Sequence, residues 1–573
     1  MQYVNGVLMT APGSAVVVND QNFQGAPAAG GLGLILIGPA TDGQPNTAIP
    51  ISGPSQALAV LKGGDLLQGA LLAFQGAAKA GGGVPLTVID PTPRTQATSA
   101  INNASSVEQI ALTSTSYGTL ANSSKWMVQA GSTSGYKVSQ ATDFVGPAGA
   151  TYPSNTTDNV SLTGLSIYYS GTGTAPTYTV SDSQLVLTAT TSDVGGTVNL
   201  TSTTTIQQAV NQINQLAGWN ATVVDPNPQD IAAAFFDNVS TAATVSTSST
   251  TPTNLTANVT AVVRYFNNLN LYFTAVRQAG ATSLATSGTW TYAAGGTSPT
   301  ATNTNWQNAY TTAQSVTGIS LISCVSDSYS IWDMNDAHCQ YMASIGQPRR
   351  GYLGDTSGQA LSTETAQAAL LNSARSSIVW PEQYGTNFNG VAQTLFAPYL
   401  VACGIIGQRA ATIAYRALTQ QPVVSGGMGV SVAPSSVSTG LSGGVAVIAP
   451  NQAGVPVLQH DETTWLQSTA YNLVENSTGL VADLISADLN AVLATFVGQP
   501  VTATTVSVAQ SLVLSHLVNW YNSGFLAVAP TAANVSLTGS GDTITGTAQI
   551  ALDVPANYIV LQLTPVAATV AAA

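Results

Sequence analysis

The chain has 573 residues, of which only 6% are charged, and this length allows roughly three or four domains. Its 12 Lys and Arg against 25 Asp and Glu give a net charge of −13, which argues against direct nucleic-acid binding. No run reaches the roughly 18 consecutive apolar residues of a membrane span, and no cation precedes Lys62 to begin a signal peptide. Three well-spaced cysteines indicate no disulfide framework. We therefore expect a soluble protein that folds in a cytoplasm.

The first hundred residues predict an arm followed by an α/β layer. Residues 1–25 form the expected N-terminal arm, in which Val16, Val17 and Val18 belong to a short β-prone run before a Gly/Pro-rich joint. Residues 26–104 begin the core. They read as a strand at 32–38, helices at 52–64 and 64–83, and a strand at 85–90.

The pattern changes between residues 105 and 290. Short alternating runs separated by turn signals predict β-hairpins, so this segment is expected to be one or two β-rich domains inserted into the core. Two helical stretches are expected within it, at about 205–218 and 257–280.

The α/β pattern resumes over 291–554, the expected second part of the core, and a long helical region is predicted from about 466 to 524. The C-terminal arm is expected at 555–573. There, Ile559, Leu561 and Leu563 lie on one face of an uncharged strand. The predicted fold class is therefore α+β and multidomain, with a mixed α/β core, a β-rich insertion and extended arms at both ends.

The stretch "HCQYMASIGQPRRGYLGD" at 338–355 carries scarce chemical groups, but its spacing argues against a catalytic site. His338 and Cys339 are neighbours on a predicted helix, where they point about 100° apart and cannot form a thiolate–imidazole pair. His338 falls near one helical face with Met334, Tyr341 and Met342, which predicts a packed helix.

The other catalytic and metal-binding motifs lack the neighbouring elements or the spacing that such sites require. "GLSGG" at 440–444 matches the G-x-S-x-G pattern around Ser442. However, a nucleophile elbow needs a strand before it and a helix after it, whereas here a Ser/Thr-rich loop is expected before it and a strand after it. The three Cys and three His lack zinc-ligand spacing, and no phosphate-binding loop is present. We therefore expect no enzyme activity, no catalytic, cofactor or metal residues, and no cofactor.

Several segments, read in order, resemble the tail sheath family of contractile phage tails and related injection systems. They are "APGSAVVVND" (11–20), "YAAGGTSPTATNTNWQNAYTTAQS" (292–315), "SSIVWPEQYG" (376–385), "TLFAPYLVACGIIGQRA" (394–410), "GGVAVIAPNQAGVPVLQHDETTW" (443–465) and "VPANYIVLQLTP" (554–565), together with the helix, turn and basic pair of 338–355. The resemblance covers about 1–100 and 290–573. It departs from the family pattern at "GQRAATIAYRALTQQP" (407–422), where an acidic, Trp-containing stretch would be expected.

The resemblance implies a mechanical role in a viral tail. Sheath subunits polymerise as stacked hexameric rings around a tail tube and contract to drive the tube through the host envelope for genome ejection. The implied partners are copies of the same chain, the tail tube protein, and the baseplate and tail terminator proteins, with no membrane insertion. The implied location is the virion tail, assembled in the host bacterial cytoplasm. The arms, with Val16 to Val18 and Ile559, Leu561 and Leu563, would link neighbouring subunits.

Other interpretations remain open. The chain could be the sheath of a phage-derived injection system, or a secreted surface-layer-type structural protein, which would share the acidic, cysteine-poor composition. A polysaccharide-active enzyme would need paired carboxylates in a cleft, and the β-rich segment has few acids.

The charges are also unevenly placed along the chain. Five of the eight arginines lie between Arg349 and Arg416, and no Lys or Arg follows Arg416. We therefore expect the segment 349–416 to contact the acidic segment 417–573 of a neighbouring copy.

Overall fold

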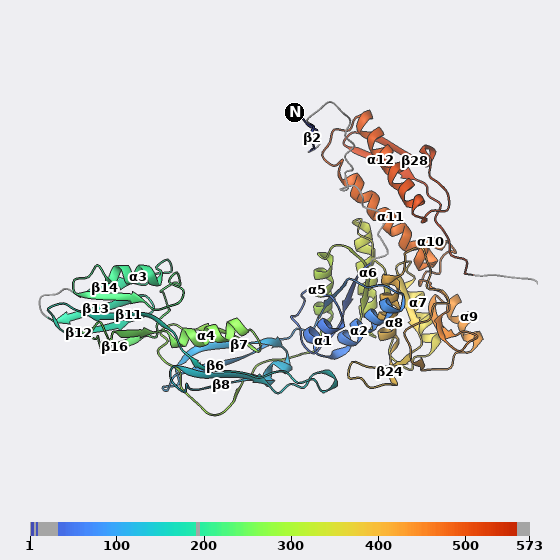
Figure 1. The fold of residues 1–573 in the computed structure, drawn as a ribbon. Coiled ribbons are helices and arrows are strands. Elements are labelled where there is room, and N and C mark those ends of the chain that lie inside the picture. Colours follow the sequence, from blue (N-terminus) through green and yellow to red (C-terminus); the bar gives the residue numbers. More distant parts are fainter. Residues whose placement is uncertain (1, 5–6, 10–31, 191–194, 558–573) are drawn as a thin grey trace, which may run out of the picture.

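The computed structural model describes residues 2–4, 7–9, 32–190 and 195–557. Figure 1 shows a central α/β core with two projections, one formed by the inserted segment and the other by the C-terminal helices. At the N-terminus, β1 (Gln2–Val4) pairs with β2 (Val7–Met9) in an antiparallel hairpin.

The core contains two four-stranded sheets that meet edge to edge, with strand orders β4-β5-β3-β20 and β21-β22-β26-β27. Backbone hydrogen bonds from Ile322 to Arg350 (2.9 Å) and from Arg350 to Ser320 (3.0 Å) join them. Their inner strands are parallel, and β4 and β27 are antiparallel to their neighbours. The strands are β3 (Gly33–Ile37), β4 (Ile49–Ile51), β5 (Leu86–Ile89), β20 (Ile319–Cys324), β21 (Gly351–Leu353), β22 (Ser376–Trp380), β26 (Val445–Pro450) and β27 (Pro456–Leu458).

Both faces of the core sheets are covered by helices, which explains why β3 is an uninterrupted apolar run. Leu34 and Leu36 pack on the face of α2 (Gly64–Lys79) and α8 (Pro398–Ala411). Ile35 and Ile37 pack on the opposite face. The helices on that face are α5 (Asn303–Gln314), α6 (Tyr329–Ser344), α7 (Leu361–Leu371) and α9 (Pro434–Ser442). The short helix α1 (Pro54–Leu61) precedes α2.

Small residues let α2 and α8 pack in close contact. A β-carbon at Gly76 would lie 2.0 Å from the carbonyl oxygen of Gly404, and one at Gly407 would lie 2.1 Å from that of Ala73. No larger side chain fits at either position without moving the helices apart.

The inserted segment consists of two units, an inner unit next to the core and an outer unit farther from it (Figure 1). The chain of the outer unit is inserted between two elements of the inner unit. The inner unit holds the sheets β18-β7-β6 and β10-β9-β8-β19, with helix α4 (Asn258–Leu269). Its strands are β6 (Gln96–Asn102), β7 (Glu108–Tyr117), β8 (Ser124–Ala130), β9 (Tyr136–Thr142), β10 (Asn155–Val160), β18 (Phe273–Arg277) and β19 (Thr291–Tyr292).

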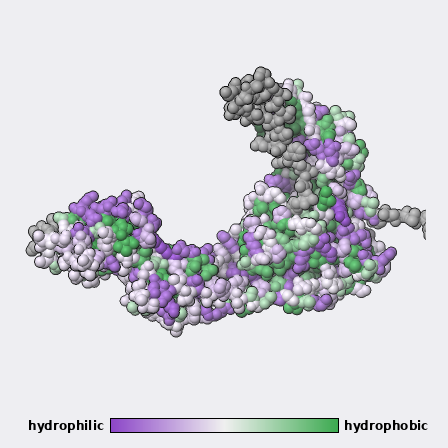
Figure 2. All heavy atoms as spheres, in the orientation of Figure 1, coloured by the Kyte–Doolittle hydropathy of each residue, from purple (hydrophilic) through white to green (hydrophobic). Residues whose placement is uncertain are grey.

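The outer unit lies between β10 and α4 in the chain and has its own apolar core. It contains the sheets β15-β11-β17 and β14-β13-β12-β16 with helix α3 (Ile206–Ile213). Its strands are β11 (Thr163–Tyr169), β12 (Thr174–Val180), β13 (Gln184–Thr190), β14 (Gly196–Asn199), β15 (Trp219–Val223), β16 (Val239–Thr244) and β17 (Thr253–Thr256). In Figure 2 the pale colour of weakly polar residues covers much of both units.

The structure corrects two expectations for this segment. The boundary expected at residue 105 falls between β6 and β7, which pair in one sheet, because the polar sequence of β6 gives little hydrophobic alternation. The helix expected over 257–280 ends at Asn270, whose φ of 45° is left-handed, and residues 273–277 form strand β18 instead.

Asparagine side chains cover one edge of two sheets in the inserted units. On edge strand β18, Ala275 donates to Asn267 Oδ1 (2.8 Å) and accepts from its Nδ2 (2.9 Å). On edge strand β15, Ala221 exchanges the same two bonds with Asn214, at 2.7 and 3.0 Å. Each amide thereby satisfies a donor and an acceptor that a further strand could otherwise pair with.

The C-terminal helices form a separate unit rather than part of the second core segment expected over 291–554. Helices α11 (Asn476–Ala494) and α12 (Ala503–Asn522) pack with β28 (Val535–Ser540) and β29 (Thr543–Ala548). Their own core includes Leu517, Trp520 and Phe525, and the last two rings lie 5.0 Å apart, edge to face.

Among the described helices, α11 alone is long and apolar enough to cross a membrane. Its Asp483, however, forms ion pairs with Arg350 and Arg375, and its Asp488 accepts hydrogen bonds from His516 and Trp520. These contacts and its packing in the C-terminal unit are those of a helix within a folded protein.

Candidate functional site: the root of α11

The residues around His338 are part of the packed protein interior. His338 is buried in α6, and its Nε2 accepts a hydrogen bond from Arg349 Nη1 (2.9 Å). Burial, and then the charge of Arg349, lowers the pKa of His338 to about 4, while burial raises the pKa of the Cys339 thiol. Both groups are therefore uncharged near neutral pH. Tyr341, expected on the buried face, is 49% exposed, because α6 instead buries Cys339.

Ser442 is the last residue of a helix rather than part of a nucleophile elbow. The stretch expected to be a loop before it is α9, and β26 follows it, so the order of strand and helix is the reverse of an elbow. Ser442 Oγ donates to the carbonyl oxygen of Thr439 (3.0 Å). No group of three or more His, Cys, Asp or Glu in the described residues is arranged to hold a metal ion.

Arginines that were expected to meet acids of a neighbour meet them within the same chain. Arg350 Nε lies 2.6 Å from Asp483 Oδ2, and Arg375 Nη2 lies 3.0 Å from Asp483 Oδ1. These two arginines are paired within their own chain, because α11 folds back onto the core and brings Asp483 to both of them. The expected contact between segments 349–416 and 417–573 of neighbouring copies stays a prediction.

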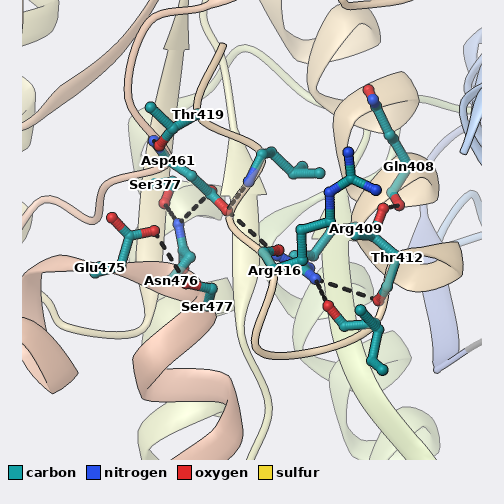
Figure 3. Close-up of polar contacts among 12 residues, drawn as sticks. Ser377, Gln408, Arg409, Thr412, Arg416, Thr419, Asp461, Glu475, Asn476 and Ser477 are labelled. Carbon is teal, nitrogen blue, oxygen red and sulfur yellow. Dashed lines mark hydrogen bonds and ion pairs between the residues drawn. The ribbon is translucent and has the colours of Figure 1, made fainter. Parts of the chain in front are cut away.

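A buried polar network surrounds the start of α11, and we call it the α11 root (Figure 3). Asp461 is 0% exposed and pairs with Arg409, which is 1% exposed, at 3.5 Å. Asp461 also accepts hydrogen bonds from Tyr352 Oη (2.7 Å) and from the backbone N–H of Leu418 (3.2 Å). These further bonds offset part of the cost of burying the carboxylate.

Asn476, the first residue of α11, connects the helix to this network. Its backbone N–H donates to the carbonyl oxygen of Asp461 (3.0 Å), and its Nδ2 donates to Ser377 Oγ (2.7 Å) on β22. The first turn of the helix, Asn476 to Gly479, is buried in the core. The root therefore fixes the C-terminal unit to the sheet by polar contacts rather than by apolar packing alone.

A second group of charges lies beside the root, at the end of the described chain. His460 lies 2.8 Å from Glu462 and 2.9 Å from Glu475, and Asn557 Nδ2 donates to Glu475 Oε2 (2.8 Å). Burial alone would lower the pKa of His460, but hydrogen bonds and charges from both glutamates raise it well above its usual value. A protonated His460 thus pairs with both acids, and Asn557 attaches the last described residues to them.

Asp461, Asn476 and Gly479 are not among the site residues expected from the sequence. The available signal was "HDE" at 460–462, three ionisable residues after a buried strand in a chain with few charges. The residues expected to link subunits, Val16, Val17, Val18, Ile559, Leu561 and Leu563, lie outside the described residues.

Comparison with known proteins shows which proteins this chain resembles in sequence and in fold. No model of a known protein family matches the chain. The tail sheath protein of Bacillus phage SP01 is 25% identical over 522 residues, which cover 87% of this chain and 85% of that protein. The chain is a tail sheath homologue.

Solved sheath proteins share the fold of this tail sheath homologue. The sheath tail protein of Desulfitobacterium hafniense matches with a TM-score of 0.55 at 13% identity, covering 94% of this chain and 96% of that one. The sheath tail protein of Listeria innocua matches with a TM-score of 0.57 at 12% identity, covering 92% and 93%. The multidomain α+β fold and the family resemblance inferred from the sequence are confirmed.

Proposed function

We propose that this chain is the structural subunit of a contractile tail sheath. It polymerises as stacked hexameric rings around a tail tube and contracts to drive the tube through the host envelope. The observation that carries this proposal is the match to a phage tail sheath protein over 87% of the chain. The α11 root supports it, because a subunit that transmits force needs firm attachment between its units.

The subunit acts without catalysis in this proposal. His338 and Cys339 are uncharged and buried, and Ser442 has no elbow, so none of these residues offers an activated nucleophile. Work on the envelope is instead done by the change from an extended to a contracted polymer.

The proposed partners are other copies of the chain, the tail tube, the baseplate and the tail terminator. The arms at 1–25 and 555–573 connect neighbouring copies, with Val16 to Val18 and Ile559, Leu561 and Leu563 as the pairing residues. Their uncharged β-prone sequences support strand addition to a neighbour's sheet. The proposed location is the virion tail, after assembly in the host cytoplasm.

Electron microscopy of the purified protein tests the proposal directly. Negative staining should show rings or long hollow tubes. A protein that stays monomeric at all concentrations, with a native circular-dichroism spectrum, would contradict it.

The inserted units are proposed to face outward on the cylinder and to be unnecessary for polymerisation. The backbone N–H of Thr95 donates to the carbonyl oxygen of Thr297 (3.1 Å), so the two chain crossings lie side by side at the core. A short glycine linker can therefore replace residues 97–294. Tubes from this shortened chain are expected, and a folded variant that forms none would overturn this assignment.

A further inference from the structure

The inner and outer units of the insertion meet at a joint rich in charges. Only two chain crossings connect them, near Leu162 and near Ala257, and an arrangement of this kind is often a flexible hinge. Here each unit contributes charged side chains to the other. We call the contact the outer joint and define it by Asp182, Asp230 and Asp237 of the outer unit and Arg264, Arg277 and the start of α4 in the inner unit.

Arg277 is the most connected residue of the outer joint. From strand β18 of the inner unit, its Nη1 lies 2.8 Å from Asp182 Oδ1 of the outer unit. Its Nη2 donates to the carbonyl oxygens of Phe236 in the outer unit (2.7 Å) and Ala281 in the inner unit (3.1 Å). The planar guanidinium thus contacts both units at once, and its side chain is only 8% exposed.

The acids of the outer joint bind backbone as well as side chains. Asp182 Oδ2 accepts from the N–H of Gly280 (2.6 Å). Asp237 accepts from the N–H groups of Asn258 (2.8 Å) and Val259 (3.0 Å), the first two residues of α4. These N–H groups have no partner within the helix, so a carboxylate from the other unit satisfies them and complements the helix dipole.

A second ion pair adds to this contact. Arg264 of α4 pairs with Asp230 of the outer unit, and its guanidinium lies over the ring of Phe235, 5.3 Å from the ring centroid. The outer joint therefore uses two of only 12 cations in the chain. In both ion pairs the arginine and its acid lie far apart in sequence, at separations of 34 and 95 residues.

We propose that the inner and outer units form one stiff strut, and that Arg277 is the positioning residue that fixes the angle between them. A hinge needs a low cost of reorientation, whereas reorientation here would leave a mostly buried guanidinium and three carboxylates without partners. The strut would hold the outer unit at a constant place relative to the core. This inference concerns the single subunit and does not depend on the proposed function.

Distance measurements between spin labels test the strut. The native Cys324, Cys339 and Cys403 are fully buried, so labels can be directed to the exposed positions of Ala130→Cys in the inner unit and Gln212→Cys in the outer unit. Double electron–electron resonance on the full chain should give one narrow distance distribution. Arg277→Ala should broaden it at least twofold.

Lys125→Ala is the matched control, because it removes an ion pair with Asp143 that lies inside the inner unit. The control should leave the distribution unchanged. Should Arg277→Ala lose its native circular-dichroism spectrum, Arg277→Lys replaces it and should give intermediate broadening, since an ammonium cannot make the same set of contacts. A broad distribution in the unmutated protein, or no broadening on removal of Arg277 contacts in a folded variant, would overturn the proposal.

Discussion

The guanidinium of Arg350 lies directly against the backbone of Gly479 in the first turn of α11, so that a β-carbon at Gly479 would lie 2.3 Å from Arg350 Nη2. Glycine inside a helix ordinarily costs about 1 kcal/mol relative to alanine. Here the missing side chain leaves the space in which Arg350 reaches Asp483.

Gly479→Ala should therefore destabilise the protein, contrary to the usual effect of this change in a helix. We expect a loss of about 1–3 kcal/mol, because the added methyl group displaces a buried, paired arginine. Urea unfolding checks this. Ser486→Ala, at an exposed position of the same helix, serves as the control and should change little. Increased stability of Gly479→Ala would show that Arg350 can move at no cost.

Asp483→Asn should weaken attachment of the C-terminal unit. The change leaves Arg350 and Arg375 without their shared carboxylate, and loss of one partner from a mostly buried pair costs about 3 kcal/mol. Hydrogen exchange should rise in α11 and α12 before it rises in the core sheets. Asp542→Asn removes an exposed acid for comparison, and equal exchange in the two variants would refute the role of Asp483.

Stability should fall between about pH 4.5 and pH 8 because of Glu364. This side chain is fully buried in α7, and neither carboxylate oxygen has a hydrogen-bond partner in the described part of the chain. Burial, followed by the charges of Asp355 and Glu382, raises the pKa of Glu364 from 4.5 to about 8. The folded state therefore binds more protons than the unfolded state in this range, and folding becomes less favourable as the pH rises.

Glu364→Gln should remove that pH dependence, whose full size is at most about 5 kcal/mol. The variant should be more stable than the unmodified protein at pH 8 and close to it at pH 4.5. Thermal melts across this range measure the effect. Parallel curves for the two proteins would mean that Glu364 titrates normally.

Polymer stability should depend little on salt. Eight of the 12 cations are already paired with acids of their own chain, so few charges remain for contacts between copies. Sedimentation of tubes between about 0.05 and 1 M NaCl spans Debye lengths from more than 10 Å to about 3 Å. The pelleted fraction should stay constant, and dissolution at high salt would indicate ion pairs between subunits.

Two C-terminal truncations should separate folding from assembly. Chains that end at 557 or at 554 both lack the proposed pairing residues and should remain folded but form no tubes. Only the shorter chain also loses the contact of Asn557 with Glu475, so it alone should show a lower melting temperature. Tubes from either chain would refute the linking role of the C-terminal arm.

Local patterns in the sequence were enough for the alternating α/β core and the β-rich insertion. Strand β3 and helix α2, for example, have clear apolar patterns and lie where they were expected. The insertion of the outer unit within the chain of the inner unit could not be predicted from the sequence, because β7 pairs with β18 across about 160 residues without any local signal. The charge asymmetry was real, but composition cannot distinguish a pair within one chain from a pair between two, so Arg350 and Asp483 were assigned to different copies.

The two asparagines that cover edge strands β15 and β18 also bear on the environment in which the particle stays intact. Charged residues are the more common protection of a sheet edge, but acid neutralises carboxylates and salt screens every charge. The amides of Asn214 and Asn267 neither titrate nor respond to ionic strength. These two edge contacts would thus persist in acidic, dilute or saline surroundings, so that Ala221 and Ala275 stay closed to a further strand under all of these conditions.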